Sequence, residues 1–445
     1  MNTDGDPART EEVSVSLHHA EQPPGTTEPP ATTPDSATDS APDAAPDPHA
    51  RYRGAAIAVV CVALFVDMLV YGLAIPVLPL LPALEDAGST GTGILFASYA
   101  ASLLLITPFA GRLVDRHGPR TPLLLGLIGF GAATLLFAVG GPYPLLLVGR
   151  LFQGAAAGLS WVAGLSLIAM VTPLADRARW MGLAMSMVAL GVLAGPPLGG
   201  FIATHWGTHA PFVVAAVVAL LDAVARLMLV PRLPHQQNDD PAGPTTVLRV
   251  PGTLAVVGLI IVQAGLIAAL EPVLPFHLAD TIAADSTRIG LLFALTVVVG
   301  ATLNPIVGGL VATVDNRLLT GIGVLFGAVS IWWAGAADST WSVALAMALL
   351  GAATAFIAAP ATTLIGVQGG KASPPALGGA YALFNIAYAI GLLIGPLLSG
   401  PLTDALDLSG ALTAIAVLTV VGGGAAALCA PSIAGLTDDA SPRPS

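Results

Sequence analysis

Charge is the scarcest property of this sequence. Asp, Glu, Lys and Arg together make up 10% of its 445 residues, whereas apolar residues make up 55%. A soluble domain of this length could not expose so much apolar surface to water. The composition therefore excludes an ordinary soluble protein, and we expect the lipid bilayer to be the solvent of most of the chain.

Groups that carry chemistry in enzymes are also few. The two cysteines, Cys61 and Cys429, fall in apolar stretches without metal-ligand spacing, so we expect small apolar groups rather than a disulfide or a metal site. There is no phosphate loop ending in Gly-Lys-Ser or Gly-Lys-Thr, no His cluster, and no Ser, His and Asp set near one interface. We predict neither an enzyme nor a cofactor. Much of the acidic excess lies in the tails and loops, and nothing predicts a nucleic-acid partner.

The two ends of the chain differ in kind from the rest. Residues 1–50 are rich in Pro, Thr, Ala and Asp and carry almost no large apolar side chains, which predicts a disordered tail. This segment also lacks the pattern of a secretory signal, so we expect the first apolar stretch to be kept as a spanning helix. Residues 431–445 are interpreted as a second short tail.

Between these tails the chain consists of apolar stretches of about 20 residues or more, the length that crosses a hydrocarbon core of about 30 Å. The longest polar break, residues 231–250, is the expected linker between two halves, residues 51–230 and 251–430. We predict an all-α membrane protein with twelve transmembrane helices, at residues 55–81, 91–112, 120–140, 143–170, 179–204, 209–230, 252–279, 288–312, 317–335, 340–366, 375–402 and 408–430.

Basic residues gather in alternate loops, which predicts the orientation. One set of loops carries Arg51, Arg53, Arg112, Arg116, Arg120, Arg177, Arg179, Arg232, Arg249, Arg317 and Lys371. The opposite loops carry Glu85, Asp86, Asp280, Asp285, Asp338, Asp404 and Asp407, with Arg288 as the basic exception. By the positive-inside rule both tails and the linker are cytoplasmic. We expect a multi-pass protein of the cell membrane that functions as a monomer.

An internal repeat relates the two halves. Ile75 to Pro79 corresponds to Glu271 to Pro275, and the Gly191, Gly195, Pro196 pattern recurs as Gly391, Gly395, Pro396 at nearly the same separation. Each matched pair is separated by six expected spans, so both copies cross the membrane in the same direction. Two glycines four residues apart allow a neighbouring helix to approach closely, and the proline after them predicts a bend. The repeat predicts two pseudo-symmetric six-helix halves.

These motifs resemble the major facilitator superfamily, and within it the drug:proton antiporters. The segment Gly111 to Arg120 is similar to the superfamily's signature loop, Leu147 to Gly154 to its fourth-helix motif, and Gly191 to Gly200 to the fifth-helix motif of exporters. From its charges we expect the loop with Asp115, Arg116 and Arg120 to form a cytoplasmic clasp between helix ends. We expect a conformational role for the residues of these motifs, namely Gly111, Asp115, Arg116, Gly118, Arg120, Gly191, Gly195, Pro196, Gly199, Gly395 and Pro396.

Within the superfamily the pattern is most similar to the vesicular amine transporter branch. The similar segments include Phe65 to Leu69, Leu270 to Pro275, and Tyr381 to Pro396. Two positions depart from that branch: Tyr99 stands where the branch has a lysine, and Asn385 where it has an aspartate. The charge network that the branch uses for amines is therefore incomplete in this chain.

Three charged residues inside expected helices are the candidates for proton coupling. Asp67 lies near the middle of the first helix, where an acid costs about 2.5–3.5 kcal/mol on insertion scales. Glu271 lies nearer the outer face, directly before Pro272, where a broken helix could open polar backbone to a cavity. Each could instead be a structural acid, and Glu271 a gating acid. Arg150, whose counterpart the resemblance implicates in proton coupling, could hold an acid deprotonated, form a fixed ion pair or snorkel to the interface.

The remaining polar residues of the helices have simpler interpretations. Asp222 and Arg226 are spaced for a local pair on one helix face, which we expect to be structural. A pool of aromatic and amide residues could line a cavity for an organic solute: Tyr71, Tyr99, Gln153, Trp161, Gln263, Asn304, Asn385 and Tyr388.

Together these observations favour a proton-coupled antiporter that exports small organic compounds, drug-like or natural-product and possibly cationic, by alternating access. Its partners would be the solute, protons and the bilayer. An uptake symporter or an uncoupled facilitator is the alternative, and a membrane enzyme is less favoured.

Overall fold

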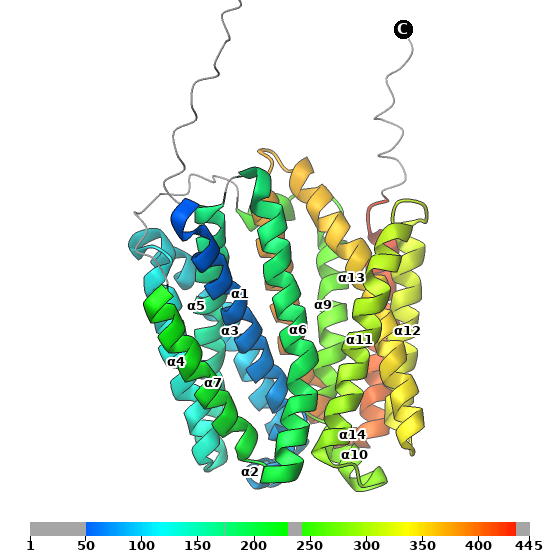
Figure 1. Cartoon of the computed structure of the whole chain (residues 1–445). Coiled ribbons are helices and arrows are strands. Elements are labelled where there is room, and N and C mark those ends of the chain that lie inside the picture. The colour runs from blue at the N-terminus through cyan, green and yellow to red at the C-terminus, as the bar shows by residue number, and fades with distance from the viewer. Residues whose placement is uncertain (1–49, 173, 230–242, 433–445) are drawn as a thin grey trace, which may run out of the picture. The chain divides into compact units, whose positions relative to one another are not determined.

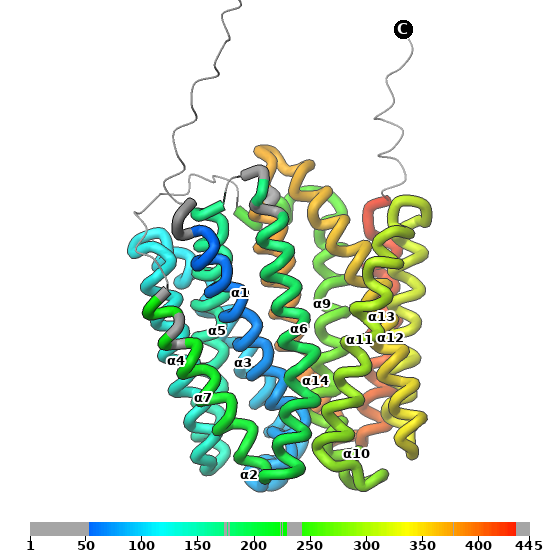
Figure 2. The backbone as a smooth tube through the Cα atoms, viewed as in Figure 1, coloured from blue at the N-terminus to red at the C-terminus, as the bar shows by residue number. Residues whose placement is uncertain are grey.

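The computed structural model describes residues 50–172, 174–229 and 243–432, and the regular structure in these ranges is helical (Figure 1). Most of the two expected tails and much of the expected linker lie outside the described residues. Two groups of helices stand side by side in Figure 2, one from the N-terminal half and one from the C-terminal half.

The N-terminal half consists of α1 (Ala50–Ala74), η1 (Leu78–Leu80), α2 (Pro82–Glu85), α3 (Gly88–His117), α4 (Arg120–Val139), α5 (Tyr143–Val171), α6 (Leu174–Trp206) and α7 (Ala210–Leu229). The C-terminal half consists of α8 (Pro244–Leu248), α9 (Thr253–Leu270), α10 (Leu274–Ile282), α11 (Ser286–Leu310), α12 (Asn316–Ala336), α13 (Thr340–Lys371), α14 (Leu377–Leu418), η2 (Thr419–Gly423) and α15 (Gly424–Cys429).

Twelve membrane crossings follow from these helices. Among the described residues, 11 helical stretches are long and apolar enough to span a bilayer, and the last of them, Gly378–Cys429, is 52 residues long. That stretch contains two helices, because Asp407 leaves the helical conformation with φ 62 at a kink inside α14. The prediction of twelve transmembrane helices in two halves is confirmed.

The predicted ends of several helices need correction. The first span, predicted to reach residue 81, ends as an α-helix at Ala74 because Pro76 and Pro79 lack the amides that would continue it. The seventh span is broken between Leu270 and Leu274, around Pro272. Inside the segment expected to be a linker, Pro244–Leu248 forms the short helix α8.

The repeated glycines pack equivalent helix pairs in the two halves. A Cβ atom added to Gly191, Gly195 or Gly199 of α6 would overlap the backbone of α1. In the C-terminal half, a Cβ added to Gly391 or Gly395 of α14 would overlap α9 in the same way. Small residues at these positions therefore let each pair of helices approach to backbone contact, as the repeat predicts.

The two halves meet at the end of the bundle opposite Ala50 and Cys429, which we call the distal end. There α3 packs on α14 and α6 packs on α11, with a Cβ on Gly93 or Gly200 meeting the backbone of the other half. The amides of Ser89 and Thr90, at the start of α3, donate to the Asp404 carboxylate at 3.3 and 2.9 Å. On the other side the Thr287 hydroxyl donates to that of Thr204 at 2.9 Å.

At the opposite, proximal end the same helices are open to their surroundings. Leu105 and Phe109 of α3 are 70% and 59% exposed, and a Cβ on Gly111, or on Gly308 of α11, would meet no atom within 4 Å. We infer that the structure is closed between the halves at the distal end and separated at the proximal end.

The distal contact of Asp404 generates a prediction. The negative charge of Asp404 lies at the N-terminal end of α3, which belongs to the other half and carries the positive end of the helix dipole. Asp404→Asn should therefore reduce the free energy that favours closure at the distal end by about 1 kcal/mol. Spin labels at Asp86→Cys and Leu406→Cys, with Cys61 and Cys429 replaced by alanine, report the separation of the halves.

The expected result is a broader distribution with a larger share of long distances in Asp404→Asn. The matched control is Asp280→Asn, which removes an exposed acid from α10. If Asp404→Asn and the control give the same distribution as the parent, Asp404 does not hold the halves together.

Candidate functional site

Asp67 belongs to a buried charged cluster within the N-terminal half. The apolar sequence of α1 carries Asp67 into the interior, where it is 2% exposed. Arg226 of α7 is 0% exposed, and its Nη2 atom lies 3.6 Å from Asp67 Oδ1. The same guanidinium pairs with Asp222, four residues earlier, and its Nη1 atom donates to the Ser160 hydroxyl of α5 at 3.2 Å. The expected local pair of α7 is thus part of a cluster that joins three helices.

Glu271 connects the two halves. It lies at the break between α9 and α10 and is 2% exposed. The Tyr71 hydroxyl of α1 donates to Glu271 Oε2 at 2.7 Å, which is the length of a strong hydrogen bond to a carboxylate. Tyr71 follows Asp67 by one helical turn, so α1 presents an acid to its own half and a phenol to the acid of the other half.

Arg150 has aromatic and amide neighbours. Its guanidinium, on a fully buried side chain of α5, lies 5.0 Å from the ring centroid of Phe96, 5.3 Å from that of Tyr99 and 5.6 Å from that of Tyr71. Its Nη1 atom donates to Gln153 Oε1 at 2.8 Å, and its Nε and Nη2 atoms have no hydrogen-bond partner. Within the described part of the chain no carboxylate lies within ion-pair distance of Arg150, so rings and an amide stabilise its charge here.

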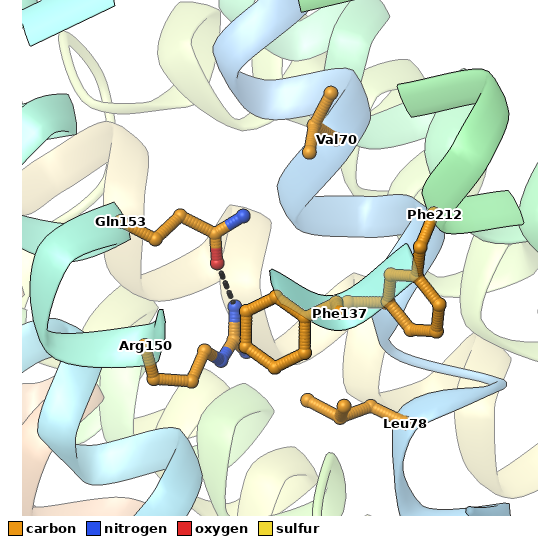
Figure 3. A pocket seen from close by; sticks show the side chains of 7 residues that line it. Val70, Leu78, Phe137, Arg150, Gln153 and Phe212 are labelled. Atoms are coloured by element: carbon orange, nitrogen blue, oxygen red, sulfur yellow. Dashed lines mark hydrogen bonds between the residues drawn. The ribbon is translucent and has the colours of Figure 1, made fainter. Parts of the chain in front are cut away.

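A small apolar pocket lies next to this arginine. Figure 3 shows Arg150 hydrogen-bonded to Gln153, with aromatic and aliphatic side chains from α1, η1, α4 and α7 around them. The lining residues are Val70, Ala74, Leu78, Phe137, Arg150, Gln153 and Phe212. Apart from Arg150 and Gln153, this lining offers no polar side chain to a solute.

The pool of possible cavity residues divides into two groups. Tyr71, Tyr99 and Gln153 gather around Arg150, with the rings of Tyr71 and Tyr99 5.1 Å apart. Among the described residues, no hydrogen bond or ring contact joins the other five members to this group. Gln263 is buried, Trp161, Asn385 and Tyr388 are half-buried, and Asn304 is exposed. Tyr388 stacks instead on Phe384, with centroids 6.3 Å apart.

Sequence reasoning missed two members of the site. Phe96 was not selected, although its spacing of three residues before Tyr99 places both rings on one face of α3. Ser160 was also missed because a single serine in an apolar helix gives no signal by itself. Among the described residues there is no group of three or more His, Cys, Asp or Glu side chains that could hold a metal ion.

The signature loop lies at the proximal end. Gly118 ends α3 with φ 72, a conformation that glycine adopts without strain. Arg120 donates from Nη2 to the Leu227 carbonyl near the end of α7, at 3.5 Å, whereas Asp115 and Arg116 are exposed. The loop thus contacts one helix end within its own half, and its role as a clasp between helix ends stays a prediction.

The comparison with protein families identifies the class. The model of the Major Facilitator Superfamily matches residues 60–270 and 256–444. The chain belongs to the Major Facilitator Superfamily. The curated relatives that it matches are named as transporters.

Individual relatives agree with the branch that the sequence motifs predict. The chromaffin granule amine transporter of Rattus norvegicus is 30% identical over 333 residues, which are 74% of this chain and 64% of that protein. The synaptic vesicular amine transporter of Bos taurus is 30% identical over 332 residues, again 74% of this chain and 64% of that protein. The chain therefore spans less than two thirds of the length of these relatives. The predicted similarity to the vesicular amine transporter branch is confirmed.

Solved structures show the same fold. The bacterial homolog of the human lysosomal transporter Spinster, in its inward-facing and occupied conformation, superposes with a TM-score of 0.72 at 16% identity. The match covers 85% of this chain and 96% of that one. The nucleoside transporter NupG gives a TM-score of 0.65 at 11% identity, over 84% and 98% of the two chains.

The Tyr71 to Glu271 hydrogen bond generates a prediction. Because the bond joins the halves and one partner is a carboxylate, Tyr71→Phe and Glu271→Gln should be coupled by about 1 kcal/mol. A double-mutant cycle on unfolding in mixed detergent micelles measures this coupling. The matched pair Tyr388→Phe and Glu271→Gln should show a smaller one, and equal couplings for the two pairs would mean that the hydrogen bond adds nothing specific.

Proposed function

We propose that this chain is a proton-coupled antiporter that exports small organic compounds, cationic ones among them, by alternating access. The proposal includes a position in the cell membrane as a monomer, with both termini in the cytoplasm, so that the distal end faces outward. The structure would then be the state that is closed to the outside.

The observation that carries the proposal is the hydrogen bond from Tyr71 to Glu271. This acid is buried, lies at a helix break and accepts its bond from the opposite half. A proton, or a cationic group of the solute, could satisfy Glu271 in place of Tyr71. Because both ligands would compete for one acid at the junction of the halves, binding of either would change the free energy of the closed state.

Asp67, the acid buried in the N-terminal half, is the second observation that supports the proposal. Asp67 is buried beside Arg226, and a carboxylate that alternates between a dry and a wet environment can take up a proton on one side and release it on the other. The names of the two amine transporters above support an organic amine among the solutes. Tyr99 and Asn385 differ from the branch, so we propose a solute range that is set by aromatic contacts around Tyr71 and Tyr99 rather than by the charges of those relatives.

The proposal is tested by proton efflux from acid-loaded proteoliposomes, followed with a pH-sensitive dye while cationic and neutral organic compounds are added outside. Antiport predicts compound-dependent proton efflux for the parent protein. In Asp67→Asn the efflux should fall to the rate of protein-free liposomes, because the side chain can no longer exchange a proton. Asp280→Asn, a change at the surface, should keep the parental rate.

Other outcomes of this experiment would support a different transport mechanism. A compound that enters the vesicles without moving protons would indicate an uncoupled facilitator. Protons that move in the same direction as the compound would indicate a symporter. Undiminished coupled efflux in Asp67→Asn would remove Asp67 from the proton path.

A further inference from the structure

The charges of the Asp67 cluster do not balance. Two carboxylates, Asp67 and Asp222, share one guanidinium, that of Arg226. With both acids ionised the cluster carries a net charge of −1. All three side chains are buried, at 2%, 4% and 0% exposure, and an uncompensated charge in such a place costs several kcal/mol.

The hydrogen bonds of the cluster leave carboxylate oxygens without a partner, and one of these oxygens can hold a proton. Arg226 uses Nη1 for Ser160 and Nη2 for Asp222. Asp67 Oδ2 and Asp222 Oδ1 are buried and have no hydrogen-bond partner. A proton on either oxygen would make the cluster neutral and so remove the cost of an uncompensated buried charge.

No other ionisable side chain of the neighbouring described helices compensates the cluster. The Tyr99 hydroxyl of α3 lies close enough to feel the charge of Asp67, but a neutral phenol adds no counter-charge to the cluster. In α6 there is no ionisable residue from Met181 to Thr204, and the nearest one to Ser160 along α5 is Arg150, about 15 Å away by helical rise. Arg120, at the start of α4, contacts the backbone of Leu227 and not the cluster acids.

We propose that Asp67, Asp222 and Arg226 form a single proton-binding unit that holds one proton, with Asp222 as necessary to it as Asp67. Arg226 sets the number of bound protons at one, because it neutralises one of the two acids and the other must then be protonated. Without Asp222, Asp67 and Arg226 would form a neutral ion pair that needs no proton. The inference rests on the proposed function for its role in transport, and it adds Asp222 and Arg226 to the proton path.

Infrared spectroscopy of the purified, solute-free protein tests the proposal directly, because a protonated carboxyl group has a carbonyl stretch that a carboxylate lacks. The protein is reconstituted in lipid nanodiscs, and difference spectra are recorded over a pH series. The parent is compared with Asp67→Asn, Asp222→Asn, Arg226→Gln and the double variant Asp222→Asn/Arg226→Gln. Glu271→Gln serves as the control for the other buried acid.

The proposal predicts a count of protonated carboxyl groups. Asp67→Asn and Asp222→Asn should each lose the band of one group relative to the parent. Arg226→Gln should gain one, because both acids then lose their counter-charge. The double variant leaves Asp67 alone without a cation and should return to the parental band. Because it is balanced in charge like the parent, it also separates loss of the proton from loss of folding, which size-exclusion profiles and helical circular dichroism check for each variant.

Two results would overturn the inference. If Asp222→Asn keeps the parental band while Asp67→Asn loses it, Asp222 is only the structural partner of Arg226. If neither substitution changes the band, the cluster holds no proton. This outcome can be separated from that of the proposed function. If the parent moves protons with a compound but its infrared bands do not follow the predicted count, antiport stands and the three-residue proton-binding unit is wrong. If the bands follow the count but no compound moves protons, the unit stands and antiport is wrong.

Discussion

The burial of charge in a protein that a bilayer surrounds is the constraint on which the rest of this structure depends. Each ionised group inside such a protein needs a counter-charge, hydrogen bonds or a proton, because its environment supplies little water. The chain meets this requirement in three different ways. Arg226 shares its charge with two acids, one of which we propose to be protonated; Glu271 accepts a hydrogen bond from Tyr71; and Arg150 lies among aromatic rings. Each solution is tied to a particular packing of helices.

The glycine-rich helix pairs provide that packing. Because α6 contacts α1 through Gly191, Gly195 and Gly199, α1 is held firmly within its half. Asp67 and Tyr71, one turn apart on α1, then face different partners. A change of protonation at either partner would act on the same helix. Helix α1 therefore takes part in both contacts: the charged cluster with α5 and α7, and the hydrogen bond to the other half.

Much of the fold could be predicted from the sequence because the bilayer imposes a simple rule on helix length and polarity. Asp67 and Glu271 stood out for the same reason, as acids within long apolar stretches. The spatial partners could not be predicted in this way. The spacing of Asp222 and Arg226 indicates a pair on one helix but says nothing of Asp67, which lies on another helix far away in the chain. Phe96 could be placed on the same helix face as Tyr99 from its spacing, but a phenylalanine in an apolar helix does not by itself indicate a buried cation. The early end of α1 at Ala74 is caused by Pro76 and Pro79, which stop the helix inside a stretch that hydropathy alone extends to residue 81.

Under the proposed function, protonation of the buried acids sets the arrangement of the two halves. The most direct measurement is the distance distribution between spin labels at Asp86→Cys and Leu406→Cys, recorded in nanodiscs at mildly acidic and mildly alkaline pH. The account predicts that the share of distally open molecules depends on pH in the parent and no longer does so in the Asp67→Asn/Glu271→Gln double variant. The same pH dependence in both proteins would contradict it.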